Sequence, residues 1–341
     1  MHRVKSIKLY FFSVLKLFFL SFRNLYYRSN YYNKKLINFI PERIFYNPST
    51  YLSASLTSIN SDFYNIIETK PDLLWKINTE DKLQFENLHS FLWLARLDRK
   101  NSKNLTKEII KSWIKRFFNY DTNTWEMEIT ARRIIAWTSN TDITLEDTDK
   151  EYKEKFFLSI IKQSNFLSKN LKSLFHGSSK IICCAGIILS GIIFKENDIK
   201  YKFGIKELEK TVKNYFDENG FPKTRNPEEV FICIKYLVLI REWFKEAQKP
   251  VPDFLNDIIT KCGNCYALLS CGDKQFPLFN GATEINHKNY DLFLKNLKYK
   301  FVNKNHEIAD LIKVKKKNWN FLLIVEIHHL ITLLNIIKRA V

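Results

Sequence analysis

Two tryptophans and an arginine recur at a spacing that could build a binding surface. Positions 125, 129, 133 and 137 lie four residues apart, so a helix would place Trp125, Arg133 and Trp137 on one face. Such a face could line a sugar-binding groove, because an indole ring packs on a pyranose and a guanidinium grips a uronate or sulfate bidentately. In the alternative reading the tryptophans are core residues, and Arg133 pairs with Glu126 or Glu128.

A second polar stretch, residues 217–227, connects two expected helices and concentrates charge just before the later one. Asn226 followed by Pro227 is a typical helix start, and the amides at a helix N-terminus attract anions. Arg225 stands beside that start and would strengthen the attraction. A simple capped turn explains Asn226 and Pro227 equally well, but it leaves Lys223 and Arg225 unexplained.

A third stretch, residues 271–282, contains glycines together with Asp273 and Asn280, which look exposed. Loops on a rigid scaffold often carry binding sites, although a plain surface connection has the same composition. His89 lies in a mixed polar and aromatic setting, where a structural role is the more common one.

The cysteines do not indicate a metal site. Cys262 and Cys265 form a CxxC motif, but no second pair of Cys or His follows at zinc-binding spacing. A chain of 341 residues needs no disulfide staples, so free thiols packed between helices are expected. We expect neither a metal nor a cofactor.

The charge balance limits the classes of partner. Lys and Arg number 54 against 36 Asp and Glu, a formal net charge of +18. A field of this sign attracts acidic polysaccharide, anionic lipid or nucleic acid. An AT-biased genome would also enrich lysine without any such partner, and no motif supports specific nucleic-acid recognition.

Helices are the elements that must position these residues. Only eight Gly and eight Pro occur, which is too few for the turns of a multi-stranded sheet. Asn104 or Thr106, Thr144 and Asn226 are suitable helix caps. Short connections imply antiparallel helix pairs. Apolar residues at i, i+3 and i+4 predict helices over 83–98, 104–119, 127–140, 145–173, 179–195, 203–217, 227–247, 252–271 and 286–297.

The N-terminal segment is apolar, aromatic and basic. The run from Leu9 to Phe22 is interrupted by Lys16, is too short to span a bilayer and precedes no typical cleavage site. A helix lying in a membrane interface and a helix packed on the domain both fit this pattern. Without a clear cleavable signal, the expected location is cytoplasmic or membrane-peripheral.

Taken in order, the three stretches and the motif Leu88-His89-Ser90-Phe91 resemble landmarks of heparinase II/III-type polysaccharide lyases, over roughly residues 70–315. The resemblance implies an (α/α) toroid followed by a β-sandwich domain, and proteins that are often periplasmic. It also implies elimination at C5 of a uronate, with Tyr and His as acid and base and with Asn, His or Arg neutralising the carboxylate.

The chain departs from the family at the residues that would do this chemistry. Where the family has an Asn-His pair entering a helix, this chain has Ser178 and Ser179. The family motif Gly-Phe-x-x-Glu-x-Ser-Pro-x-Tyr-His begins here at Gly220. Its Glu, Ser, Tyr and His positions hold Thr224, Asn226, Glu229 and Val230. The usual base is therefore missing, and either another constellation acts or the chain does not catalyse.

The C-terminal end departs from the family in another way. Lys313 to Lys317 resembles the first strand of the expected β domain, but the tail that follows has no family counterpart. Read in another register, suitable codons for residues 322–341 encode a peptide that resembles the opening of that domain. This observation suggests a frameshift and the loss of the β domain.

These observations predict an all-α protein, an (α/α) toroid or incomplete α/α barrel of antiparallel helical hairpins. The expected parts are a basic aromatic segment (1–40), the toroid (41–310) and an aberrant tail (311–341). The predicted function is that of a polysaccharide lyase acting on acidic glycans, inactive or binding-only in this chain; the alternative is a non-enzymatic scaffold docking on anionic membranes through its N-terminal helix. The expected glycan-binding residues are Arg132, Arg133, Trp137, Arg225, Asn226, Asp273 and Asn280.

Overall fold

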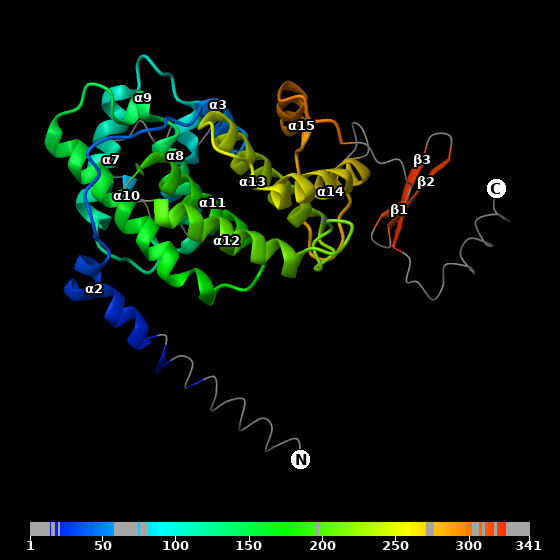
Figure 1. Ribbon diagram of the computed structural model, residues 1–341, viewed down its shortest axis with the longest axis horizontal. Coiled ribbons are helices and arrows are strands. Elements are labelled where there is room, and N and C mark those ends of the chain that lie inside the picture. Colours follow the sequence, from blue (N-terminus) through cyan, green and yellow to red (C-terminus); the bar gives the residue numbers. More distant parts are fainter. Residues whose placement is uncertain are drawn as a thin grey trace. The chain divides into compact units, whose positions relative to one another are not determined.

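The computed structural model describes residues 14, 18–19, 21–57, 74–75, 81–195, 198–270 and 276–301. It also describes the backbone of 307–308, 311–316 and 319–324. All nine helices expected from periodicity are present (Figure 1). They are α6 (Lys82–Ser90), α7 (Lys103–Phe117), α8 (Met127–Thr138), α10 (Lys150–Asn170), α11 (Ser178–Ile193), α12 (Asp198–Tyr215), α13 (Pro227–Glu246), α14 (Asp253–Leu269) and α15 (Lys288–Asn296).

Shorter helices join them. They are α2 (Asn30–Lys35), α3 (Thr50–Ala54), α9 (Thr141–Thr144) and the 3₁₀ turns η1 (Leu92–Arg96) and η2 (Leu171–Ser173). The three short α-helices lie outside the spans predicted from periodicity, whereas the two 3₁₀ turns lie within the spans predicted at 83–98 and 145–173. The helix expected over 83–98 is divided because Phe91 takes a left-handed conformation with φ of 60°. α6 therefore ends at Ser90 and η1 follows it.

Of the three helix starts predicted from capping residues, one is confirmed. The Asn226 side chain accepts a hydrogen bond from Glu228 N at 2.8 Å and caps α13, with Pro227 in the first position. The other two predictions are wrong. α10 starts five residues after Leu145 because Asp149 caps it, accepting from Tyr152 N at 2.7 Å. α7 starts directly after Ser102.

The chain forms two compact units. Unit 1 comprises residues 1–173 and 186–202, and unit 2 comprises residues 174–185 and 203–341. α11 and α12 each contribute residues to both units. The boundaries expected at residues 40 and 310 do not coincide with this division, and as domain boundaries they stay a prediction.

An aromatic cluster fills the core of unit 1. The Trp113 ring lies edge-on to Trp137 at 5.3 Å between centroids, and Trp137 stacks on Phe156 at 5.4 Å. α8 carries Trp137 and packs against both α6 and α10. Close approach of helices is aided by Gly186, where a Cβ would lie 3.0 Å from the Ala131 Cα.

Unit 2 is built around the α13–α14 hairpin and ends in a small sheet. α13 packs along α14, with Trp243 and Leu255 among their fully buried residues. The sheet is antiparallel with order β1 (Glu307–Ile308), β2 (Leu311–Lys316), β3 (Trp319–Ile324). β2 confirms a strand near 313–317, whereas most of the tail proposed to result from a frameshift, residues 325–341, lies outside the described part.

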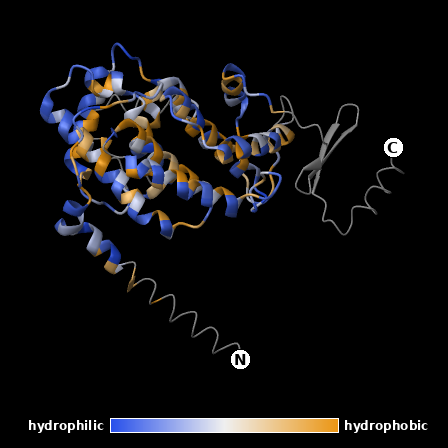
Figure 2. Ribbon diagram, in the orientation of Figure 1, coloured by the Kyte–Doolittle hydropathy of each residue, from blue (hydrophilic) through white to orange (hydrophobic). Residues whose placement is uncertain are grey.

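The helices are amphipathic, as the spacing of their apolar residues predicts. In Figure 2 most helices carry both hydrophilic and hydrophobic residues, while α11 is mainly hydrophobic. Residues Ile181 to Leu189 of α11 are buried almost without exception. Among the described helices, none combines the length and apolar character needed to cross a bilayer.

Candidate functional site

The first predicted cluster lies in the core of unit 1, so the sugar-groove interpretation of Arg133 and Trp137 is wrong. Both side chains are fully buried. The Arg133 guanidinium donates to Gln163 Oε1 at 2.7 Å and to the carbonyls of His89 and Thr124 at 2.8 and 3.0 Å. These groups leave no room for a ligand. The alternative interpretation is right that these residues belong to the core but wrong that Arg133 pairs with Glu126 or Glu128. No carboxylate lies within ion-pair distance of Arg133 among the described residues.

The buried positive charge of Arg133 is stabilised without a carboxylate, because the carbonyl end of a helix and the face of an aromatic ring lie next to it. His89 belongs to the last turn of α6, whose carbonyls carry partial negative charge. The guanidinium also lies 4.1 Å from the centre of the Trp113 ring, a cation–π distance. Lys162 repeats the arrangement, since its Nζ donates to the carbonyl of Phe118 at 2.8 Å, where α7 ends.

Arg132 points away from this core and is largely neutralised. Its guanidinium bonds Glu128 at 2.7 Å and lies 3.9 Å from Glu86, and about a fifth of the side chain is exposed. It therefore offers little free charge to an acidic ligand. Its role in glycan binding stays a prediction.

His89 is a structural histidine that shares this core. Trp113 Nε1 donates to His89 Nδ1 at 3.1 Å, so Nδ1 is an acceptor and the neutral ring carries its proton on Nε2. Burial, reinforced by the positive charges of Arg133 and Arg116, lowers the pKa of His89 to about 3.

We predict a loss of stability as pH falls through this range. The unfolded chain takes up a proton near pH 6.5 whereas folded His89 does not, so His89 alone should reduce the free energy of unfolding by about 2 kcal/mol between pH 7 and pH 5. Urea unfolding at both pH values measures the change. His89→Gln, which keeps an acceptor for Trp113, should be less pH-dependent; an identical dependence in both proteins would contradict the assignment.

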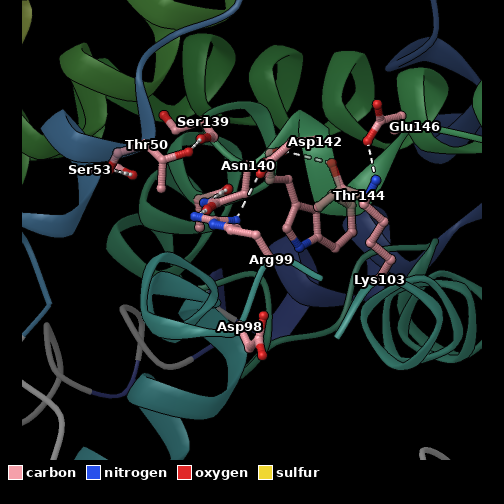
Figure 3. A network of polar contacts seen from close by, with 12 residues as sticks. Thr50, Ser53, Asp98, Arg99, Lys103, Ser139, Asn140, Asp142, Thr144 and Glu146 are labelled. Carbon is pink, nitrogen blue, oxygen red and sulfur yellow. Dashed lines mark hydrogen bonds and ion pairs between the residues drawn. The ribbon is translucent and has the colours of Figure 1, made fainter. Parts of the chain in front are cut away.

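A second polar network in unit 1 holds α9 to the start of α7 (Figure 3). Arg99 donates to Asn140 Oδ1 at 2.6 Å and lies 3.4 Å from Asp142 Oδ1. Lys103 is ion-paired with Glu146. These cations face carboxylate or amide oxygens, so the network is a structural staple rather than an anion site.

In unit 2 the structure brings the second and third predicted clusters together. Asn280 Nδ2 donates to the carbonyls of Thr224 and Arg225 at 3.4 and 3.1 Å, across more than fifty residues of sequence. Glu228 accepts from the Thr283 amide at 2.9 Å. Arg225 and Asn280 both have positive φ, 56° and 51°, a conformation that non-glycine residues rarely adopt and that clusters at functional loops.

Most polar groups of these two loops already have partners within the protein. Arg225 is ion-paired with Asp217 and packs on the Phe221 ring. Asn226 caps α13 through its side-chain oxygen, and the Asn280 amide donates to the carbonyls of Thr224 and Arg225. Asp273 lies outside the described residues. The loops thus form a preorganised frame, and direct ligand contact by Arg225, Asn226 or Asn280 stays a prediction.

Two residues at the entrance to α11 were not predicted from the sequence pattern. Phe175 is 94% exposed, the largest value among the exposed hydrophobic side chains of the described part. His176 follows it, just before Ser178 begins the helix. Their position could have indicated them, because they lie immediately before the start of α11, where the heparinase II/III-type family has its Asn-His pair.

The hydrogen bonds around His176 define its tautomer. Thr211 Oγ1 donates its only proton to the Glu207 carbonyl at 2.8 Å. It lies 3.3 Å from His176 Nδ1 and must therefore accept, so Nδ1 carries a proton. Partial desolvation, followed by the positive charges of Lys180 and Lys210, lowers the pKa of His176, while Glu207 opposes them. At neutral pH the ring is uncharged, and Nε2 is a hydrogen-bond acceptor.

A buried ion pair links α11 to α12 next to this loop. Lys180 in α11 and Glu207 in α12 are almost fully buried, with Nζ 3.4 Å from Oε2. The angle between Lys180 Nζ and Glu207 Oε2 is unsuitable for a hydrogen bond. Glu207 Oε2 therefore has no hydrogen-bond partner among the described groups. The Tyr215 hydroxyl is likewise buried without a hydrogen-bond partner in the described part.

The loop before α11 and the loop before α13 meet at the end of α12. Tyr215 Cε2 lies 3.9 Å from where a Cβ of Gly177 would stand, and the Tyr215 carbonyl accepts from the Lys223 amide at 2.9 Å. Lys223 Nζ donates to the Asn214 carbonyl at 2.8 Å. We call the set Phe175, His176, Lys210, Tyr215 and Lys223 the α12-end site.

Nothing in the described part indicates a metal centre. No group of three or more His, Cys, Asp or Glu side chains there is placed to hold an ion. Cys262 and Cys265 are buried free thiols, and burial raises the pKa of each, which makes them poor ligands and poor nucleophiles.

Apart from the small sheet within residues 307–324, the described elements are helices, and the fold belongs to the α/α-toroid class. Among solved structures, the fold is that of heparinase III. Similar structures include a heparan sulfate lyase mutant from Pedobacter heparinus (TM-score 0.56, 12% identity, 83% of this chain and 53% of that chain). Others are a heparinase III (0.54, 15%, 77% and 46%) and a heparinase III gene product (0.52, 17%, 71% and 45%).

These comparisons confirm the resemblance to heparinases at the level of the fold. The chain spans about half the length of the solved structures that it matches. No family model and no curated protein matches the sequence.

Proposed function

We propose that this chain binds an acidic, uronate-containing polysaccharide at the α12-end site and does not cleave it. The observation that carries the proposal is the exposed Phe175 ring, which precedes a neutral His176 in the positive field of the exposed Lys210. A pyranose can pack on the ring, a sugar hydroxyl can donate to His176 Nε2, and a carboxylate or sulfate is attracted by the exposed Lys210 and Lys223.

The fold supports an acidic glycan as ligand. One of the solved structures that share it is a heparan sulfate lyase, whose substrate by name is an acidic polysaccharide. The net charge of +18 has the matching sign.

Absence of cleavage is proposed from the two positions where the family carries its Tyr and His. Val230 is fully buried and has no titratable group. Glu229 lies 3.3 Å from the Thr224 hydroxyl, within hydrogen-bond distance. A carboxylate can remove a proton, but no second group at these positions can protonate the leaving sugar oxygen.

We predict that Phe175→Ala weakens binding of heparan sulfate about tenfold, because the stacking surface is lost. Phe175→Tyr keeps the ring and should bind within about twofold of the parent chain. The measurement is titration calorimetry at constant ionic strength. Leu292→Ala removes an exposed apolar side chain elsewhere in unit 2 and serves as the control.

Charge variants separate this site from general attraction by a basic protein. Lys210→Gln should weaken binding several-fold, whereas Lys111→Gln, which removes an exposed charge in unit 1, should have little effect. Equal losses from both would mean that binding follows net charge alone. Release of unsaturated uronate, followed by ultraviolet absorbance, should be absent; its appearance would overturn the non-cleaving part of the proposal.

The comparisons give no support to the alternative of a non-enzymatic scaffold that docks on membranes in place of binding glycan. One observation nevertheless favours membrane contact as an additional property. Several aromatic side chains near the N-terminus, including Phe19 and Phe22, are exposed to solvent. They belong to unit 1, so they can be tested separately from the α12-end site.

A further inference from the structure

The N-terminal helical segment carries a row of exposed apolar side chains. Its described residues, 14, 18–19 and 21–28, are helical. Positions 14, 18, 22 and 25 fall within one face of a helix, and their side chains are exposed, with values for Phe18, Phe22 and Leu25 between 57% and 66%. We call Val14, Phe18, Phe22 and Leu25 the apolar row. Phe19, 67% exposed, lies on one side of it.

The residues that follow the row are anchored to the body of unit 1. Tyr27 stacks on Tyr32 at 4.5 Å between ring centroids, and its hydroxyl bonds Asn170 in α10. Asn33 is buried, donating to the Tyr27 carbonyl at 2.9 Å and accepting from the Tyr120 amide at 3.0 Å. These contacts hold Tyr27 to Asn33 against the unit, whereas the apolar row stays exposed.

The charge of the N-terminal segment is of one sign. Residues 1–41 contain eight Lys and Arg and no Asp or Glu. Arg23 lies over the Tyr27 ring at 5.8 Å, and Arg28 donates to Thr122 Oγ1 at 3.2 Å. Lys34 and Lys35, in the last turn of α2, are exposed. An exposed apolar row within a segment of uniformly positive charge fits a surface that is apolar inside and anionic outside.

We propose that the apolar row docks on the surface of an anionic lipid bilayer, with its helix lying in the interface. Phenylalanine side chains would enter the boundary between headgroups and acyl chains, while the positive charge of the segment would attract the lipid phosphates. The anchored residues Tyr27 to Asn33 would then hold unit 1 at the membrane. The chemistry that selects this occupant over a second copy of the chain is the uniform positive charge, which opposes self-association.

The test uses the full chain and vesicles of phosphatidylcholine with or without a quarter of phosphatidylserine, separated by sedimentation. The parent chain should bind the anionic vesicles at least tenfold more tightly than the neutral ones. The triple variant Phe18→Ser, Phe22→Ser, Leu25→Ser keeps every charge and should lose at least tenfold of that affinity. If electrostatic attraction alone bound the chain to vesicles, the triple variant would keep the affinity of the parent chain.

A matched control removes three equally exposed apolar side chains elsewhere. The variant Leu83→Ser, Ile199→Ser, Leu292→Ser should bind vesicles within about twofold of the parent chain. Both variants should keep the parent far-ultraviolet circular dichroism. Equal vesicle binding by parent and row variant would overturn the proposal. So would a dimer, seen by analytical ultracentrifugation, that dissociates in the row variant, because a second copy would then cover the row.

Discussion

Replacing Arg133 with alanine is expected to reduce the free energy of unfolding by about 3–5 kcal/mol. The change removes the donors that satisfy the carbonyls of His89 and Thr124, and it leaves a cavity beside the Trp113 ring. Unsatisfied buried acceptors and lost packing both act in the same direction. Urea unfolding followed by tryptophan fluorescence measures the change.

The next residue in the sequence provides the control for this experiment. Arg132→Ala breaks a partly exposed pair with Glu128 and should cost less than about 1 kcal/mol. Similar losses from the two substitutions would mean that Arg133 is not the buried structural cation that its contacts describe.

The second large effect is expected at the buried pair of Lys180 and Glu207. Lys180→Met leaves the Glu207 carboxylate buried without its cation and should destabilise the protein by about 3–5 kcal/mol. The double variant Lys180→Met, Glu207→Leu removes both charges and should recover much of that loss. A double-mutant cycle by urea unfolding should therefore give a coupling of about 2 kcal/mol or more.

This experiment has an independent readout at His176. Because Lys180 is one of the charges that lower the pKa of His176, removing it should raise that pKa in an NMR titration. Lys213→Met, an exposed residue of the same helix as Glu207, should change neither stability nor the titration appreciably. Simple additivity in the cycle would show that the two charges do not depend on each other.

The three buried cations, Arg133, Lys162 and Lys180, show how the fold accommodates charge in its interior. Arg133 and Lys162 each reach carbonyls at or near the end of a helix, where the partial negative charge substitutes for a carboxylate. Lys180, by contrast, needs Glu207, because it lies near the N-terminal, positive end of α11. The position of a buried cation along its surrounding helices therefore decides whether it requires an acidic partner.

The sequence by itself determined the nine longer helices. Burial of one face imposes a local period of 3.6 residues, and that period can be read without knowing what covers the face. Asn226 before Pro227 likewise determined a helix start, since cap and amide are two residues apart. The resemblance to the heparinases was also predicted from the sequence, and the comparison of folds confirms it.

Only the tertiary structure decided which of these faces and loops can meet a ligand. A stripe of Trp125, Arg133 and Trp137 has the same spacing in a groove and in a core, and the helices packed on α8 make it a core. Asn280 reaches Arg225 across more than fifty residues, a contact that no local pattern contains. Phe175 and His176 lie in a short connection with no periodicity, so their exposure and their surrounding charges follow from packing alone.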